Sequence, residues 1–141
     1  MSVTFTQYFD GSFQGILRWH QLDALWEKVR AQPEGWYASL VGEALPDAPL
    51  SAEALEQFIR EMDTLLREEH DYDYCGVVYA DNPATPTMIK IYDPHNMGSA
   101  CGSSGERIWP RWVLSHLKPE PLAETAPLPG NRKRWWQKLF N

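Results

Sequence analysis

Cysteine is scarce in this 141-residue sequence, which contains only Cys75 and Cys101. Two cysteines are too few for a disulfide framework or a four-cysteine metal site, so we interpret both as small buried apolar side chains. No stretch approaches the ~18 apolar residues of a membrane-spanning helix. Residues 1–10 also lack the basic region and apolar run of a secretory signal. Together these absences predict a cytoplasmic protein with reduced thiols.

Motifs that identify common enzyme and metal-binding families are also missing. No lysine completes a GxxxxGK[ST] phosphate loop, no cysteine-hydrolase signature is present, and neither His-x-x-x-His nor Cys-x-x-Cys occurs. The four histidines are widely separated, and we interpret the acidic residues 68–73 around His70 as a solvated helix end. The sequence therefore predicts no metal and no cofactor. It favours a non-catalytic protein while leaving enzymatic activity open.

Charge is distributed unevenly along the sequence, and tryptophan is unusually frequent. The net charge is −6, yet four basic residues fall within the last ten positions, and removing their four positive charges leaves −10. An acidic body of this kind repels nucleic acid and anionic lipid, so contact with a polyanion would have to involve the C-terminal residues. Seven tryptophans are enough to serve a large core, a binding surface, or both.

The N-terminal third of the chain predicts a strand followed by a helix. Residues 3–8 alternate apolar with polar side chains, beginning with Val3 and Phe5, which favours a strand. Apolar residues recur at helical spacing within residues 23–32, which predicts a helix. Residues 13–20 fit either an upstream extension of that helix or a strand, and we leave both open.

The clearest predicted element is a helix at residues 51–69, with Ser51 as its N-cap. Short β-rich runs at residues 36–41, 74–79 and 88–92 predict strands, and the last two are joined too closely for a parallel crossover. We therefore expect a two-layer α+β fold in which an antiparallel sheet is covered by two main helices. The apolar stripe that would cover the sheet consists of Leu55, Phe58, Ile59, Met62, Leu65 and Leu66.

The last part of the chain changes character. Residues 108–117 form a short apolar segment, in which Pro110 allows a helix only at the first turn. Four prolines within residues 118–131 then predict an extended linker. We accordingly divide the chain into a domain at residues 1–117, the linker, and a separate tail at residues 132–141 that is mobile in the free protein.

A loop rich in glycine and serine is the first candidate site. Cys101 lies within it, with His95 available as a base or to lower the thiol pKa and Asp93 available to orient that histidine. Alternatively, its backbone N–H groups hold an anion or small molecule, or its glycines merely permit an irregular connection. The residues of the anion or ligand site would be Gly98, Ser99, Gly102, Ser103, Ser104 and Gly105.

The tail is the second candidate, because a helical projection separates its aromatic from its basic residues. Ten residues cannot hold a helix alone in water, so the tail would fold on what it binds. We expect a non-catalytic adaptor or accessory protein that binds a protein partner through an aromatic surface and the tethered tail. An anionic membrane surface and packing against its own acidic domain are alternatives, nucleic acid is disfavoured, and the oligomeric state is left open. The predicted partner-binding residues are Arg132, Lys133, Arg134, Trp135, Trp136, Lys138, Leu139 and Phe140.

Overall fold

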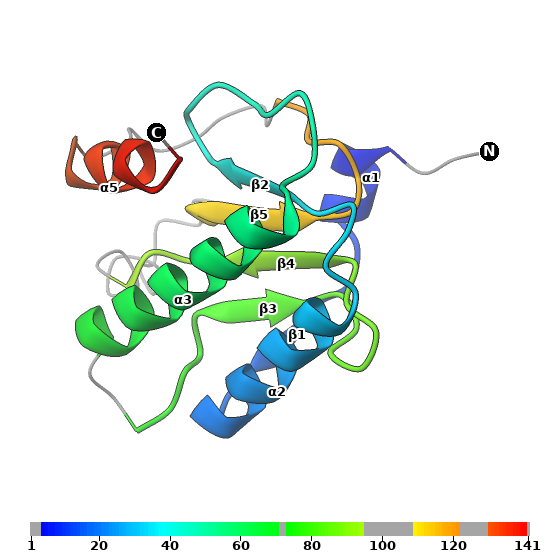
Figure 1. The fold of residues 1–141 in the computed structure, drawn as a ribbon. Coiled ribbons are helices and arrows are strands. Elements are labelled where there is room, and N and C mark those ends of the chain that lie inside the picture. Colours follow the sequence, from blue (N-terminus) through cyan, green and yellow to red (C-terminus); the bar gives the residue numbers. More distant parts are fainter. Residues whose placement is uncertain (1–3, 71–72, 95–108, 122–129, 141) are drawn as a thin grey trace, which may run out of the picture.

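A five-stranded antiparallel sheet forms the centre of the protein (Figure 1). The structure, a computed structural model, describes residues 4–70, 73–94, 109–121 and 130–140. Its strands are β1 (Gln14–Ile16), β2 (Tyr37–Leu40), β3 (Val78–Ala80), β4 (Met88–Ile91) and β5 (Trp112–Ser115), in the order β1-β3-β4-β5-β2. Every neighbouring pair is antiparallel, including β3 and β4, which form the predicted hairpin. However, β3 shares only residues 78 and 79 with the strand predicted at residues 74–79. The α+β class with an antiparallel sheet is thus confirmed.

Helices α2 (Trp19–Ala31) and α3 (Ala52–Glu69) lie against the same face of the sheet (Figure 1). The predicted ranges, residues 23–32 and 51–69, lie within these helices except for one terminal residue each, Gln32 and Ser51. The hydroxyl of Ser51 accepts a hydrogen bond from the backbone N–H of Ala54 at 3.1 Å, which is the N-cap expected for α3. All six residues of the predicted apolar stripe are buried, because this side of α3 packs on the inward-facing side chains of the sheet.

Residues 13–20 contain both of the elements that the sequence left open. They include strand β1 and the first residues of α2. The alternatives of a strand and of a helical extension therefore each account for part of the segment.

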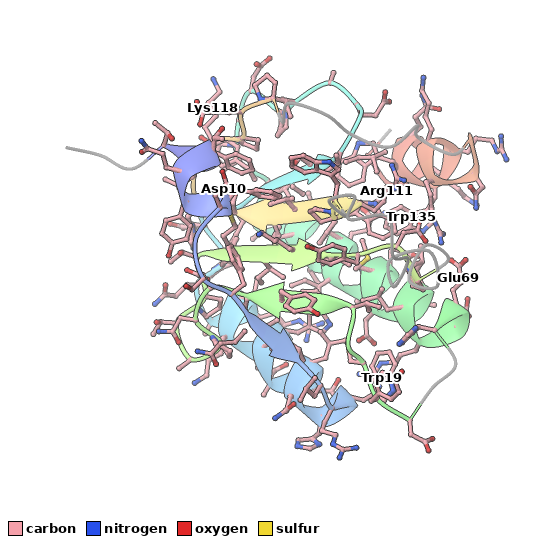
Figure 2. The ribbon with its side chains drawn as sticks, turned by 180° about the vertical axis from the view of Figure 1, so that it is seen from behind. Asp10, Trp19, Glu69, Arg111, Lys118 and Trp135 are labelled. Carbon is pink, nitrogen blue, oxygen red and sulfur yellow. The ribbon has the colours of Figure 1, made fainter. Side chains whose placement is uncertain are left out.

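The predicted strand at residues 3–8 is wrong, because this segment forms helix α1 (Phe5–Phe9). Thr4 and Gln7 make a reciprocal capping box, in which each side-chain oxygen accepts a backbone N–H of the other residue at 3.1 Å. Phe5 and Phe9, four residues apart, then bury against Val113 and its neighbours in a second apolar cluster. Figure 2 shows this helix, which ends beside Asp10, on the side of the sheet away from α2 and α3.

Residues 108–117 contain strand β5, which pairs with β4 on one side and β2 on the other. Side chains alternate along it: Trp112 and Leu114 join the core under the helices, and Val113 joins the cluster under α1. Pro110 lies ahead of the strand, where its missing N–H removes no hydrogen bond of the sheet.

A hydrogen-bonded cluster of Tyr8, Asp81 and Thr87 joins α1 to the β3–β4 hairpin. Both hydroxyls donate to the Asp81 carboxylate, which also accepts the backbone N–H groups of Thr87 and Met88 at 2.9 and 3.0 Å. Burial alone would raise the pKa of Asp81, but these hydrogen bonds outweigh it and lower the pKa. The ionised carboxylate is therefore the form that stabilises the fold.

We expect the Asp81→Asn variant to be less stable than the wild type by on the order of 2 kcal/mol at pH 7. Because the pKa of Asp81 is lower in the folded than in the unfolded protein, its carboxylate stabilises the fold at pH values above the unfolded-state pKa. This contribution disappears as the pH falls through the folded-state pKa. The difference in unfolding free energy between the two proteins should therefore shrink below about pH 4. Urea unfolding from pH 2.5 to 7 measures it, with the exposed Asp47→Asn as control. A difference that is constant with pH would contradict the assignment.

Candidate functional site

The C-terminal residues form helix α5 (Gly130–Phe140), which packs on the body of the protein. The Trp135 ring meets Trp112 edge-on at 5.7 Å between centroids, and the Trp136 ring meets Phe58 at 6.3 Å. Leu139 is buried with them. Figure 1 shows α5 beside the loop that follows β2. The expectation of a free tail is therefore corrected, and the alternative of packing against its own domain describes the structure.

Arg132 anchors α5 through a buried network of charged hydrogen bonds. Its guanidinium donates to both carboxylate oxygens of Asp93 at 2.9 and 3.0 Å and to both of Glu69 at 2.7 and 3.1 Å. Only 3% of Arg132 is exposed, and its guanidinium lies 5.6 Å from the centre of the Trp112 ring. Burial alone would lower the pKa of Arg132, but the hydrogen bonds that it donates to the two carboxylates raise it. The helix is thus held by a permanently charged side chain.

Arg111 approaches the same carboxylate from the end of β5. Its Nε lies 3.8 Å from Asp93 Oδ2, and its Nη1 donates a long hydrogen bond of 3.5 Å to the Val41 carbonyl. Burial is the main cause that lowers the pKa of Arg111. Among the described residues, its buried Nε has no hydrogen-bond partner. Figure 2 shows Arg111, Trp135 and Glu69 gathered at one end of the molecule.

Of the residues predicted for the site in the glycine- and serine-rich loop, only Asp93 lies in the described part of the chain. Asp93, the proposed orienting residue, is 4% exposed and accepts the hydrogen bonds from Arg132. Cys75, which we interpreted as buried, is inaccessible, and its burial raises the pKa of its thiol. The remaining loop residues lie outside the described residues, and their catalytic and anion-binding roles stay predictions; they are His95, Gly98, Ser99, Cys101, Gly102, Ser103, Ser104 and Gly105.

The predicted tail residues divide between two sides of α5. Arg132, Trp135, Trp136 and Leu139 contact the body, as described above. The side chain of Phe140 lies outside what the structure describes. Three cations are exposed on the outer side, namely Lys133, Arg134 and Lys138. Among them, Lys133 Nζ lies 3.9 Å from Glu43 Oε1, a distance at which attraction is weak in solvent.

Sequence reasoning did not find the partners of Arg132. Asp93 and Glu69 lie 39 and 63 residues away from it along the chain. Neither separation belongs to a local sequence motif. A basic segment at the end of an acidic chain is as typical of a solvated tail as of a docked one. The uneven charge along the sequence was the available signal, and it indicated attraction without indicating the contact.

Three further findings bear on what the protein could bind or resemble. Within the parts of the chain that the structure describes, no three His, Cys, Asp or Glu residues are grouped so that they could hold a metal ion. No helix in those parts combines the length and the apolar character needed to cross a bilayer. No protein-family model, no curated protein and no solved structure matches the chain.

Proposed function

We propose that the protein is a non-catalytic binding module that presents α5 as a preformed basic helix to an acidic surface of a protein partner. One observation carries the proposal. Docking buries Arg132 and packs the partly buried Trp135 and Trp136 against the core. It leaves Lys133, Arg134 and Lys138 exposed on the opposite side of the helix. The cations therefore lie on a defined surface.

Because α5 is already folded on the body, it avoids the loss of conformational entropy that a free tail would undergo when it binds. A helix of 11 residues is marginal in water by itself, because nucleation fixes several residues for a single hydrogen bond. Packing of α5 against Trp112 and Phe58 provides that order before any partner arrives. A pre-ordered surface loses less conformational entropy on association, which favours affinity.

The charge distribution favours an acidic protein over a membrane or a nucleic acid. A basic patch on an acidic body gives the molecule a dipole that would orient an acidic partner toward α5 and speed the encounter. A membrane contact would use the tryptophans at the lipid interface, but Trp135 and Trp136 pack against the core. A long polyanion would also meet the acidic body around the patch.

Neutralising the exposed side of α5 should abolish partner binding without affecting the fold. In the triple variant Lys133→Gln, Arg134→Gln, Lys138→Gln, we expect at least a tenfold loss of affinity, because each contact charge contributes up to about 1 kcal/mol. Quantitative affinity capture with wild type and variant first identifies proteins that depend on these charges. Calorimetry with the purified partner at low and high salt then measures the loss.

A control variant with the same change in net charge separates local contact from overall charge. Lys28, Arg60 and Lys118 are exposed and lie on other segments, so their joint replacement by glutamine should leave the affinity within twofold. Equal weakening by both triple variants would contradict a contact through α5. Binding to vesicles containing phosphatidylserine with a blue shift of tryptophan emission, in place of any purified protein partner, would refute the proposal.

A further inference from the structure

A cavity of about 270 Å³ opens on the side of the sheet that α1 covers. The residues that line it include Val41 and Val113 of the β2–β5 region and Phe5 of α1. The loop after β2 and the segment at residues 119–121 complete the lining, and each contributes one glutamate, Glu43 and Glu120. The lining is therefore mainly apolar and contains two acidic residues.

Backbone hydrogen bonds hold the cavity walls before any ligand binds. The Val41 N–H donates to the Arg111 carbonyl at 2.8 Å, which continues the β2–β5 pairing to the cavity lining. The chain then turns sharply, since the Glu43 N–H donates to the Leu40 carbonyl at 3.0 Å, and Gly42 between them has a φ of +102°. This turn holds the backbone of Glu43 at the cavity edge.

The segment at residues 119–121, which lines the cavity, is fixed to α1. Glu120 Oε1 accepts the backbone N–H of Thr6 at 2.9 Å and the Thr6 hydroxyl at 3.3 Å. Pro119 and Pro121 on either side restrict the backbone of this segment. Within the described structure, Glu120 Oε2 accepts no hydrogen bond, so this oxygen is available to a donor.

The lining has charge of one sign. No lysine, arginine or histidine is among the described residues that line the cavity, whereas both of its charged residues are glutamates. The body around it is also acidic, which raises the local concentration of cations. Two basic groups lie next to lining residues: Arg111 Nη1 is 3.5 Å from the Val41 carbonyl oxygen, and Lys133 Nζ of α5 is 3.9 Å from Glu43 Oε1. That lysine competes with any cation that would bind Glu43.

We infer that the cavity binds a small organic ammonium compound, with its apolar body on Phe5, Val41 and Val113 and its cationic group between Glu43 and Glu120. The volume suits a ligand of modest size, since it falls just below the range of drug-sized pockets. The apolar lining would reject a bare metal ion, and the two carboxylates would reject an anion. This inference goes beyond the proposed function, because it involves no protein partner, although Lys133 takes part in both.

Titration with phenethylamine, a protonated arylalkyl amine at neutral pH, tests the inference directly. Backbone amide shifts in two-dimensional NMR should move around Phe5, Val41 and Glu43, and the neutral analogue 2-phenylethanol should bind at least tenfold more weakly. Equal binding of amine and alcohol would overturn the assignment of the carboxylates. Shifts confined to residues outside the cavity would overturn the assignment of the site.

Substitutions on the two sides of the Glu43–Lys133 contact should act in opposite directions. Glu43→Gln is expected to weaken phenethylamine binding at least fivefold, while Lys133→Gln strengthens it two- to threefold by freeing the carboxylate. Glu53→Gln, an exposed change on α3, is the matched control and should have no effect. An unchanged dissociation constant for Glu43→Gln, in a protein shown by its NMR spectrum to be folded, would refute the inference.

Discussion

Arg132→Ala should lower the free energy of unfolding by about 3 kcal/mol and release α5 from the body. The substitution leaves Asp93, which is 4% exposed, and Glu69 without four hydrogen bonds. Removing hydrogen bonds from a buried charge is costly, and Arg111 at 3.8 Å is too distant to replace those that Arg132 donates to Asp93. Urea unfolding measures the stability, and hydrogen exchange of the α5 amides measures the release.

Arg134 provides a matched control, because it lies on the same helix and is exposed. Arg134→Ala makes the same change in net charge and should stay within about 0.5 kcal/mol of the wild type. Arg132→Lys should fall between the two alanine variants, since lysine keeps the charge but loses the paired geometry of the guanidinium. If Arg132→Ala were as stable as Arg134→Ala and kept its α5 amides protected, the anchor would be refuted.

Phe58→Ala should destabilise the protein by about 3–5 kcal/mol. Phe58 of α3 is fully buried in the core between the helices and the sheet and also meets the Trp136 ring edge-on. Truncation removes the apolar surface and leaves a cavity between the helix and the strands, which the surroundings fill only in part. Urea unfolding of the variant provides the value, and increased exchange in α5 would show that the two contacts are linked.

Glu61→Ala tests whether this loss belongs to the buried side of α3. Glu61 lies on the same helix and is exposed, so its replacement should change stability by less than about 0.5 kcal/mol. A loss below about 1 kcal/mol for Phe58→Ala would show that the α3 stripe does not form the core.

The long helix and the hairpin were predictable because their signals are local. In α3, an N-cap at Ser51 and apolar residues at helical spacing agree with each other over five turns, and the structure buries all of these apolar residues. Strands β3 and β4 are close in sequence, so their short connection leaves an antiparallel hairpin as the simple arrangement. Where several local preferences coincide, tertiary packing has little to decide.

The N-terminal segment shows why short elements are harder to predict. Val3 and Phe5 fit an alternating strand, while Phe5 and Phe9 fit one face of a helix, and five residues are too few to separate the two periods. The capping box of Thr4 and Gln7, together with burial of both phenylalanines under the sheet, decides for α1. Both the capping box and the Phe5–Phe9 pair can be recognised in the sequence. Only the burial of the two phenylalanines in the folded protein favours the helix over the alternating strand.

The amino-acid sequence alone determined the α+β class, the two main helices, the β3–β4 hairpin and the amphipathic character of the C-terminal residues. These features depend on the spacing of apolar and polar side chains along neighbouring turns and strands. Only the tertiary structure decided that α5 docks on the body and that Glu43 and Glu120 line one cavity. Arg132 reaches Asp93 and Glu69 across 39 and 63 residues, and such contacts arise from the folded path of the chain, which no local spacing records.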